Sequence, residues 1–214
     1  MLQRLRSTGS GLHEDGCQGP DLGPPGLTWM PRSLGAGVHA LLATTPPKNN
    51  NGIVAGDEAA LVIDAGITPL VSRKLQAEAA VLTGSPVRYL IDTSSRGDHS
   101  FGNVAFPAGV QILASAHARA AMRNLTAEKA RLTPYMGGDD TALSAVTEWC
   151  LPATTFGARL ELDLGGLTVQ FWRFGPGSSP GDAVVYVPEA RVAWTSLSWL
   201  AAADARRRRW GGGA

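Results

Sequence analysis

The segment DTSSRGDHSFGN, from Asp92 to Asn103, follows the strand-like run VRYLI and decides how the rest of the chain is interpreted. It has the composition of a loop and contains adjacent Asp98 and His99, whose side chains are good ligands for a divalent metal ion. In α/β proteins ligands bind beyond the carboxyl ends of the strands, so a site is expected here. A catalytic metal takes about three protein ligands, usually imidazole and carboxylate. The segment therefore predicts a metal site only if further ligands come from elsewhere.

The composition is that of a globular chain of one domain. The chain has 214 residues, of which 44% are hydrophobic and 17% charged. A formal net charge of +1 argues against a general affinity for nucleic acid or anionic membranes, and no apolar run is long enough to span a bilayer. The N-terminal residues lack the apolar core of a secretory signal. Only Cys17 and Cys150 occur, without a CxxC motif, which predicts a cytoplasmic protein without a disulfide framework.

The chain divides into three parts by composition. Residues 1–33 are rich in glycine and proline and have no periodicity, so we expect a disordered leader. Residues 34–198 carry the periodic pattern of a folded domain, and residues 199–214 form an Ala/Arg/Gly segment that we expect to be a disordered tail. The run Arg206–Arg209 is more typical of a solvated tail than of a nucleic-acid site, although weak, salt-dependent binding through it is a separate hypothesis.

Strands and helices alternate through the predicted domain. Thr68 and Pro69 have the residue types of a helix N-cap and first turn, and apolar residues then recur at helical spacing. The order of elements predicts a layered α/β body with mixed sheets. Strands are predicted at 37–44, 52–56, 59–66, 87–91, 110–115, 158–164, 167–174, 183–187 and 191–196, and helices at 68–82, 117–132 and 141–149.

This order, together with three motifs, resembles the metallo-β-lactamase superfamily. The motifs are DTSSRGDHSFGN, the loop GPGSSPGD at Gly175–Asp182, and the hairpin NNNGIVAGDEAALVIDAG at Asn49–Gly66. The resemblance covers about Val38 to Thr195. It implies an αββα four-layer sandwich, incomplete here at its C-terminal end, and a family of mostly zinc- or iron-dependent hydrolases.

The resemblance fails at the metal ligands. Where the family has three histidines for its first metal, this chain has Ser94, Arg96 and Ser178, while Asp98 and His99 stand at positions that hold the second metal. Serine is a poor ligand for zinc or iron, and arginine cannot be deprotonated and carries a fixed positive charge. The bridging carboxylate and the last histidine of the family also have no counterpart, since the segment WTSLSW has Ser196 and Leu197 at the first of these positions.

Two functions follow as hypotheses. The first is a hydrolase homologue that has lost its metal centre and its activity, holds no cofactor, and is silent or serves as a binding module. The second is a divergent metal-dependent hydrolase of an ester, thioester or lactam, which holds zinc or iron weakly at Asp98 and His99 and uses Asp98 in catalysis. Asp64, Asp182 or the substrate would then supply further ligands.

Structural roles compete with these readings. Asp98 has the residue type to pair with Arg96 or to cap the following helix, Asp64 to support the loop from beneath, and Asp182 to stabilise its own loop. Arg96 would alternatively bind an anionic ligand in the pocket that the family uses for metal.

The expected partners are a small molecule and, for an exposed C-terminal edge, a second copy or another chain; a membrane is not expected.

Overall fold

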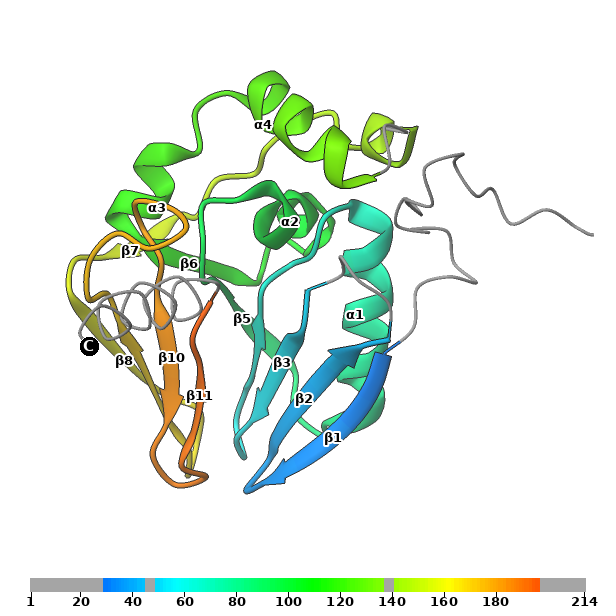
Figure 1. Cartoon of the computed structure of the whole chain (residues 1–214). Helices are drawn as coiled ribbons and strands as arrows, with labels where there is room; N and C mark the ends of the chain where they lie inside the picture. The colour runs from blue at the N-terminus through cyan, green and yellow to red at the C-terminus, as the bar shows by residue number, and fades with distance from the viewer. Residues whose placement is uncertain (1–28, 45–48, 137–140, 197–214) are drawn as a thin grey trace, which may run out of the picture.

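The computed structural model of the chain describes residues 29–44, 49–136 and 141–196, and these build two packed sheets with helices around them (Figure 1). The larger sheet has seven strands in the order of the sequence. They are β1 (Trp29–Gly35), β2 (Val38–Ala43), β3 (Asn51–Ala55), β4 (Ala60–Ile63), β5 (Val87–Asp92), β6 (Gln111–Ser115) and β7 (Thr154–Phe156). Pairing is antiparallel from β1 to β4 and parallel from β4 to β7.

The smaller sheet is antiparallel and has the order β11-β10-β9-β8. Its strands are β8 (Arg159–Asp163), β9 (Thr168–Trp172), β10 (Val184–Val187) and β11 (Val192–Trp194). The helical elements are α1 (Pro69–Leu82), α2 (Gly97–Ser100), η2 (Phe101–Ala105), α3 (Ala116–Ala121), α4 (Leu125–Leu132), η3 (Thr133–Met136) and η4 (Thr141–Ala145).

Two apolar cores hold these layers together. One lies between the sheets, where buried Leu61 and Ile91 of the larger sheet belong to the same cluster as Val169 and Phe171 of the smaller. The other lies between the opposite face of the larger sheet and α1, which contributes Leu75 and Ala79. The strand pattern follows from this arrangement, because β4, covered on both faces, is apolar at every position, whereas β8 alternates exposed and half-buried residues. A helix layer, a large sheet and a second sheet are therefore present, as predicted.

Helix α1 begins where the sequence predicted. The side chain of Thr68 accepts a hydrogen bond from the backbone N–H of Val71 at 3.2 Å, and Pro69 occupies the first turn. The predicted helix at 117–132 is wrong in one respect, since it divides into α3 and α4. Asn124 ends the continuity because its side chain accepts from the N–H of Ala127 at 2.9 Å and starts a new helix.

The leader prediction is wrong for residues 29–33. They belong to β1, which pairs with β2 at the edge of the larger sheet, where Pro31 is tolerated. The predicted helix at 141–149 is reduced to the 3-10 turn η4, and the short strand β7 had not been predicted. Residues 1–28 of the predicted leader and the whole predicted tail, like the expected incomplete C-terminal end, lie outside the described residues. Within 29–44, 49–136 and 141–196, no helix has the length and apolar character needed to cross a membrane.

Candidate functional site

The loop after β5 lies at one end of the two sheets, where it meets the loop between β9 and β10 and the start of α4. Asp64, directly after β4, supports this loop from beneath. Its carboxylate accepts hydrogen bonds from the N–H of Thr93 at 2.7 Å and from the Thr93 hydroxyl at 2.8 Å. The Asp64 backbone has a positive φ of 64°, which aspartate tolerates better than most residues, and its carbonyl accepts from Asn51 at 2.8 Å.

His99 is buried against the same carboxylate. The residue belongs to α2 and is 4% exposed, and its Nδ1 is 2.8 Å from Asp64 Oδ2. Its Nε2 has no hydrogen-bond partner among the described residues and lies 3.6 Å from Asp98 Oδ2. Burial alone would lower the pKa of His99, but the charges of Asp64, Asp98 and Asp182 and the Asp64 hydrogen bond outweigh it and raise that pKa to about 9. The ring is therefore an imidazolium at neutral pH.

Asp98 is held by residues other than those the sequence suggested. Its Oδ2 accepts from Asn49 Nδ2 at 2.9 Å, and its Oδ1 is 3.7 Å from a guanidinium nitrogen of Arg131. It pairs with Arg131 and not with Arg96, and it stands inside the first turn of α2, whose N-cap is Arg96.

The serines at the family's first-metal positions are gathered around one carboxylate. Asp182 is 4% exposed and accepts from the Ser178 N–H at 2.7 Å, the Ser178 hydroxyl at 2.9 Å and the Ser94 hydroxyl at 3.1 Å. It also accepts from the N–H of Ser179 at 3.2 Å and from the Ser179 hydroxyl. Asp182 thus stabilises its own loop, as the sequence indicated, and in addition ties that loop to the segment after β5.

Arg96 completes this cluster. One of its terminal nitrogens donates to the carbonyl of Ser178 at 2.8 Å, and the other is 3.8 Å from Glu128 of α4. The structure therefore brings Ser94, Arg96 and Ser178 together, with Asp98 and His99 beside them. Ser196, near the position of the family's bridging carboxylate, has a buried hydroxyl without a partner in the described part of the chain, and Leu197 lies outside that part.

These donors do not fit a zinc or iron ion. In residues 29–44, 49–136 and 141–196, no group of three or more His, Cys, Asp or Glu side chains is placed to hold a metal. The hydroxyls of Ser94 and Ser178 are bound to Asp182, and Arg96 brings a fixed positive charge among them. His99 would have to lose a proton before its ring could ligate a metal.

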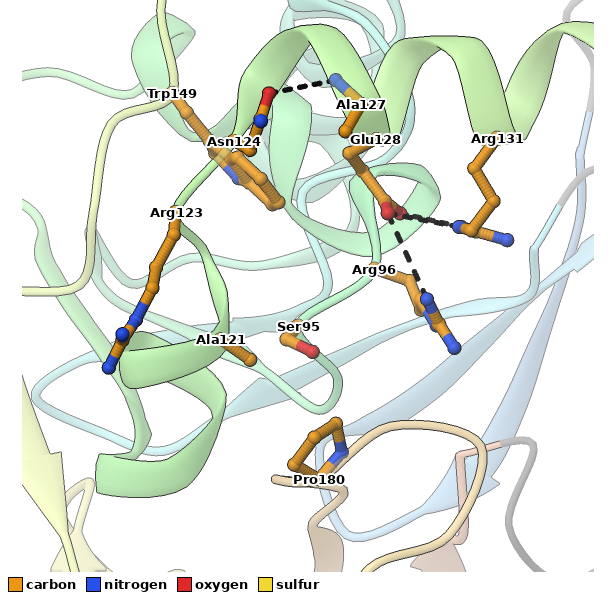
Figure 2. A pocket seen from close by; sticks show the side chains of 10 residues that line it. All are labelled: Ser95, Arg96, Ala121, Arg123, Asn124, Ala127, Glu128, Arg131, Trp149 and Pro180. Carbon is orange, nitrogen blue, oxygen red and sulfur yellow. Dashed lines mark hydrogen bonds and ion pairs between the residues drawn. The ribbon is translucent and has the colours of Figure 1, made fainter.

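A pocket of about 320 Å³ opens beside this cluster (Figure 2). It lies between the loop after β5, the start of α4 and the loop that carries Pro180. Its lining residues are Ser95, Arg96, Ala121, Arg123, Asn124, Ala127, Glu128, Arg131, Trp149 and Pro180. Sequence reasoning found only Arg96 among them. Glu128 and Arg131 carried no signal beyond the ordinary spacing of an ion pair on a helix surface.

Comparisons with known proteins agree with the fold and the motifs. The model of the metallo-beta-lactamase superfamily matches residues 44–195. A metallo-beta-lactamase from Pontibacter korlensis has a similar structure with a TM-score of 0.55 and 19% sequence identity, over 76% of this chain and 68% of that chain. The stereoselective inverting sec-alkylsulfatase Pisa1 from Pseudomonas sp. is similar with a TM-score of 0.57 and 15% identity, over 75% of this chain and 30% of that one. No curated protein matches the sequence.

At these identities the structural likeness concerns the fold alone, but the family model covers most of the chain, including both motif loops that meet at the site. The chain belongs to the metallo-β-lactamase superfamily and has its mixed α/β fold of two packed sheets.

Proposed function

We propose that this protein has lost the metal centre and the hydrolytic activity of its superfamily and binds a small molecule at the same end of the sheets. The observation that carries the proposal is the cluster at the first-metal positions. There, Arg96 donates to the Ser178 carbonyl, and Asp182 accepts the hydroxyls of Ser94 and Ser178. Hydrogen bonds within the protein thus satisfy the groups that would otherwise have to receive a cation.

The chemistry of these groups supports the proposal. Zinc and iron prefer imidazole, thiolate and carboxylate, and neutral hydroxyls are weak replacements. The guanidinium of Arg96 brings a fixed positive charge to this cluster, so it repels a cation placed beside it. Without a metal-activated water, the site has no strong nucleophile at neutral pH. The free Cys150 and the lack of a CxxC motif support the further proposal of a cytoplasmic location.

One observation favours a divergent hydrolase as the second candidate. His99 Nε2 is buried without a hydrogen-bond partner among the described residues, and Asp98 Oδ2 is 3.6 Å away, so two potential ligands of a single weak zinc or iron site are adjacent. Two contacts oppose it. Arg131 competes for Asp98, and Asp64 holds the proton on His99.

The test is the metal content of the purified, untagged protein, measured by elemental analysis after incubation with excess zinc and removal of the unbound ion. We expect far less than one equivalent of zinc or iron in the wild-type protein. About one equivalent of metal that is lost in both Asp98→Ala and His99→Ala would overturn the loss of the metal centre and favour the divergent hydrolase. Esters, thioesters and lactams would then be screened as substrates.

A gain-of-function variant tests whether the three replacements are the cause. The triple change Ser94→His, Arg96→His and Ser178→His places three imidazoles at positions that the structure brings together. We expect this variant to retain zinc where the wild-type protein does not. Circular dichroism and the urea midpoint of the variant provide the control for folding. A well-folded triple variant without zinc would show that residues other than these three abolished the site.

A further inference from the structure

We propose that the pocket beside Arg96 binds a small organic anion, in which a carboxylate or phosphate group is attached to a flat apolar body. This inference names the ligand class for the proposed function and rests on it. The volume of about 320 Å³ falls within the range of roughly 300–1,000 Å³ that is usual for small-molecule sites. The lining combines three guanidinium groups, one carboxylate, one tryptophan and several small apolar side chains.

The charges of the pocket favour an anion. Its carboxylate, Glu128, is already neutralised, because it receives two hydrogen bonds from Arg131, at 2.9 and 2.6 Å, and one from the N–H of Gly97 at 2.8 Å. Arg96 shares this carboxylate with Arg131, at the longer distance of 3.8 Å. Its shortest contact is with the neutral carbonyl of Ser178. Arg123 donates to the carbonyl of Ala120 and makes no ion pair within the described residues. Two positive charges in the lining are thus left without a dedicated counterion.

Ser95 adds a neutral hydrogen-bonding group to the pocket lining. The residue is 6% exposed, and its N–H donates to the Ser179 hydroxyl at 3.3 Å, but its own hydroxyl makes no hydrogen bond to any described residue. Figure 2 shows this hydroxyl at the pocket, between Arg96 and Ala121. A ligand oxygen placed there would gain a hydroxyl donor from Ser95 and a charged donor from a guanidinium.

Trp149 and its apolar neighbours favour a ligand with a flat apolar body. The indole N–H of Trp149 donates to the Ser100 hydroxyl at 3.0 Å, and its ring meets Phe101 edge-on at 5.2 Å between centroids. The ring is therefore held in place, and together with Ala121, Ala127 and Pro180 it presents apolar surface to the pocket. A flat apolar group against this wall would add stacking to the ionic contact. Inorganic phosphate can make the ionic contact but has no group that stacks.

Phenyl phosphate is the probe, and its binding is measured by isothermal titration calorimetry in phosphate-free buffer with EDTA. Phenol serves as the uncharged control and inorganic phosphate as the control without an apolar body. We expect phenyl phosphate to bind at least about tenfold more tightly than either. Ser95→Ala and Arg123→Gln should each weaken its binding about tenfold, and Trp149→Leu should weaken phenyl phosphate more than inorganic phosphate. Arg88→Gln, an exposed arginine at the start of β5, should leave binding unchanged.

Three results would overturn the inference: no saturable binding of phenyl phosphate, binding that Ser95→Ala and Arg123→Gln leave unchanged, or equal weakening by Arg88→Gln. The metal analysis separates this failure from that of the proposed function. Zinc in the wild-type protein, together with phenyl phosphate binding that depends on Ser95 and Arg123, would overturn the loss of the metal centre and support the pocket. A metal-free protein that binds no phenyl phosphate would support the loss of the metal centre and overturn the anion pocket.

Discussion

Replacing His99 by glutamine tests whether the buried His99–Asp64 pair carries a positive charge. The imidazole is 4% exposed, lies 2.8 Å from Asp64 Oδ2 and has Asp98 Oδ2 3.6 Å from its other nitrogen. These carboxylates raise the pKa of His99 from 6.5 to about 9 in the folded protein. Glutamine keeps a side chain that can donate to Asp64 but cannot take up the proton.

The direction of the pH effect follows from proton linkage. Between pH 6.5 and about 9 the folded protein holds a proton that the unfolded chain releases, so rising pH favours unfolding in this window. The stabilisation is fully present below pH 6.5 and is lost as the pH rises through about 9. Each pKa unit corresponds to about 1.4 kcal/mol. The His99 contribution to the free energy of unfolding should therefore fall by about 3 kcal/mol between pH 6.5 and about 9.

Urea denaturation of the wild-type protein and His99→Gln at a series of pH values measures this contribution as the difference between the two. The proton resonances of the histidine rings give a second readout, because the signal that disappears in His99→Gln should titrate near pH 9 in the wild-type protein. Parallel stability curves for the two proteins, or a titration midpoint at or below 6.5, would refute the reasoning.

Three further predictions concern other parts of the site, and urea denaturation checks each of them. Asp182→Ala removes the acceptor of two backbone N–H groups and three hydroxyls and should lower the free energy of unfolding by about 3 kcal/mol, whereas Asp163→Ala, at the exposed end of β8, should lower it by less than about 1 kcal/mol. Gly102→Ala should cost about 3 kcal/mol or prevent folding, because its Cβ would lie 2.2 Å from the carbonyl oxygen of Ala65, and an unchanged midpoint would contradict this contact. Burial raises the pKa of Asp92 well above its usual value, so the folded state loses stability as the pH rises above about 4. Asp92→Asn should therefore stabilise the protein at pH 7 and flatten this dependence, and a less stable variant would refute the assignment.

The elements that the sequence predicted correctly are those with local signals. Thr68 and Pro69 mark the start of α1, and the predicted strands at 52–56 and 59–66 correspond to β3 and β4, which pair as neighbours in the chain. The errors fall where distant contacts override local preference. β1 contains Pro31 and ends at Gly35, both unfavourable in a strand, and it exists because β2 provides a partner.

In the candidate site, too, the residue types follow from the sequence but their contacts do not. The residue types at Ser94, Arg96 and Ser178 are facts of the sequence, and they suffice to predict a defective metal site because ligand chemistry depends on the side chain itself. The partners of those residues were not predictable. A pair of Arg96 with Asp98, two residues away, was one alternative from the sequence, but Arg96 contacts Glu128 and Ser178 instead.

The sequence by itself thus determined the order of α1 and of strands β2–β6 and β8–β11, the frame of the two motif loops and the absence of the family's histidines, since all three depend on short-range pattern or residue identity. Only the tertiary structure decided that Asp182 gathers hydroxyls from Ser94, Ser178 and Ser179 and that Ser95 shares a pocket with Arg123 and Trp149. The physical reason is chain distance. The bond from Ser94 to Asp182 spans 88 residues, and side-chain contacts across such separations arise only after both sheets have packed and brought their loops to one end.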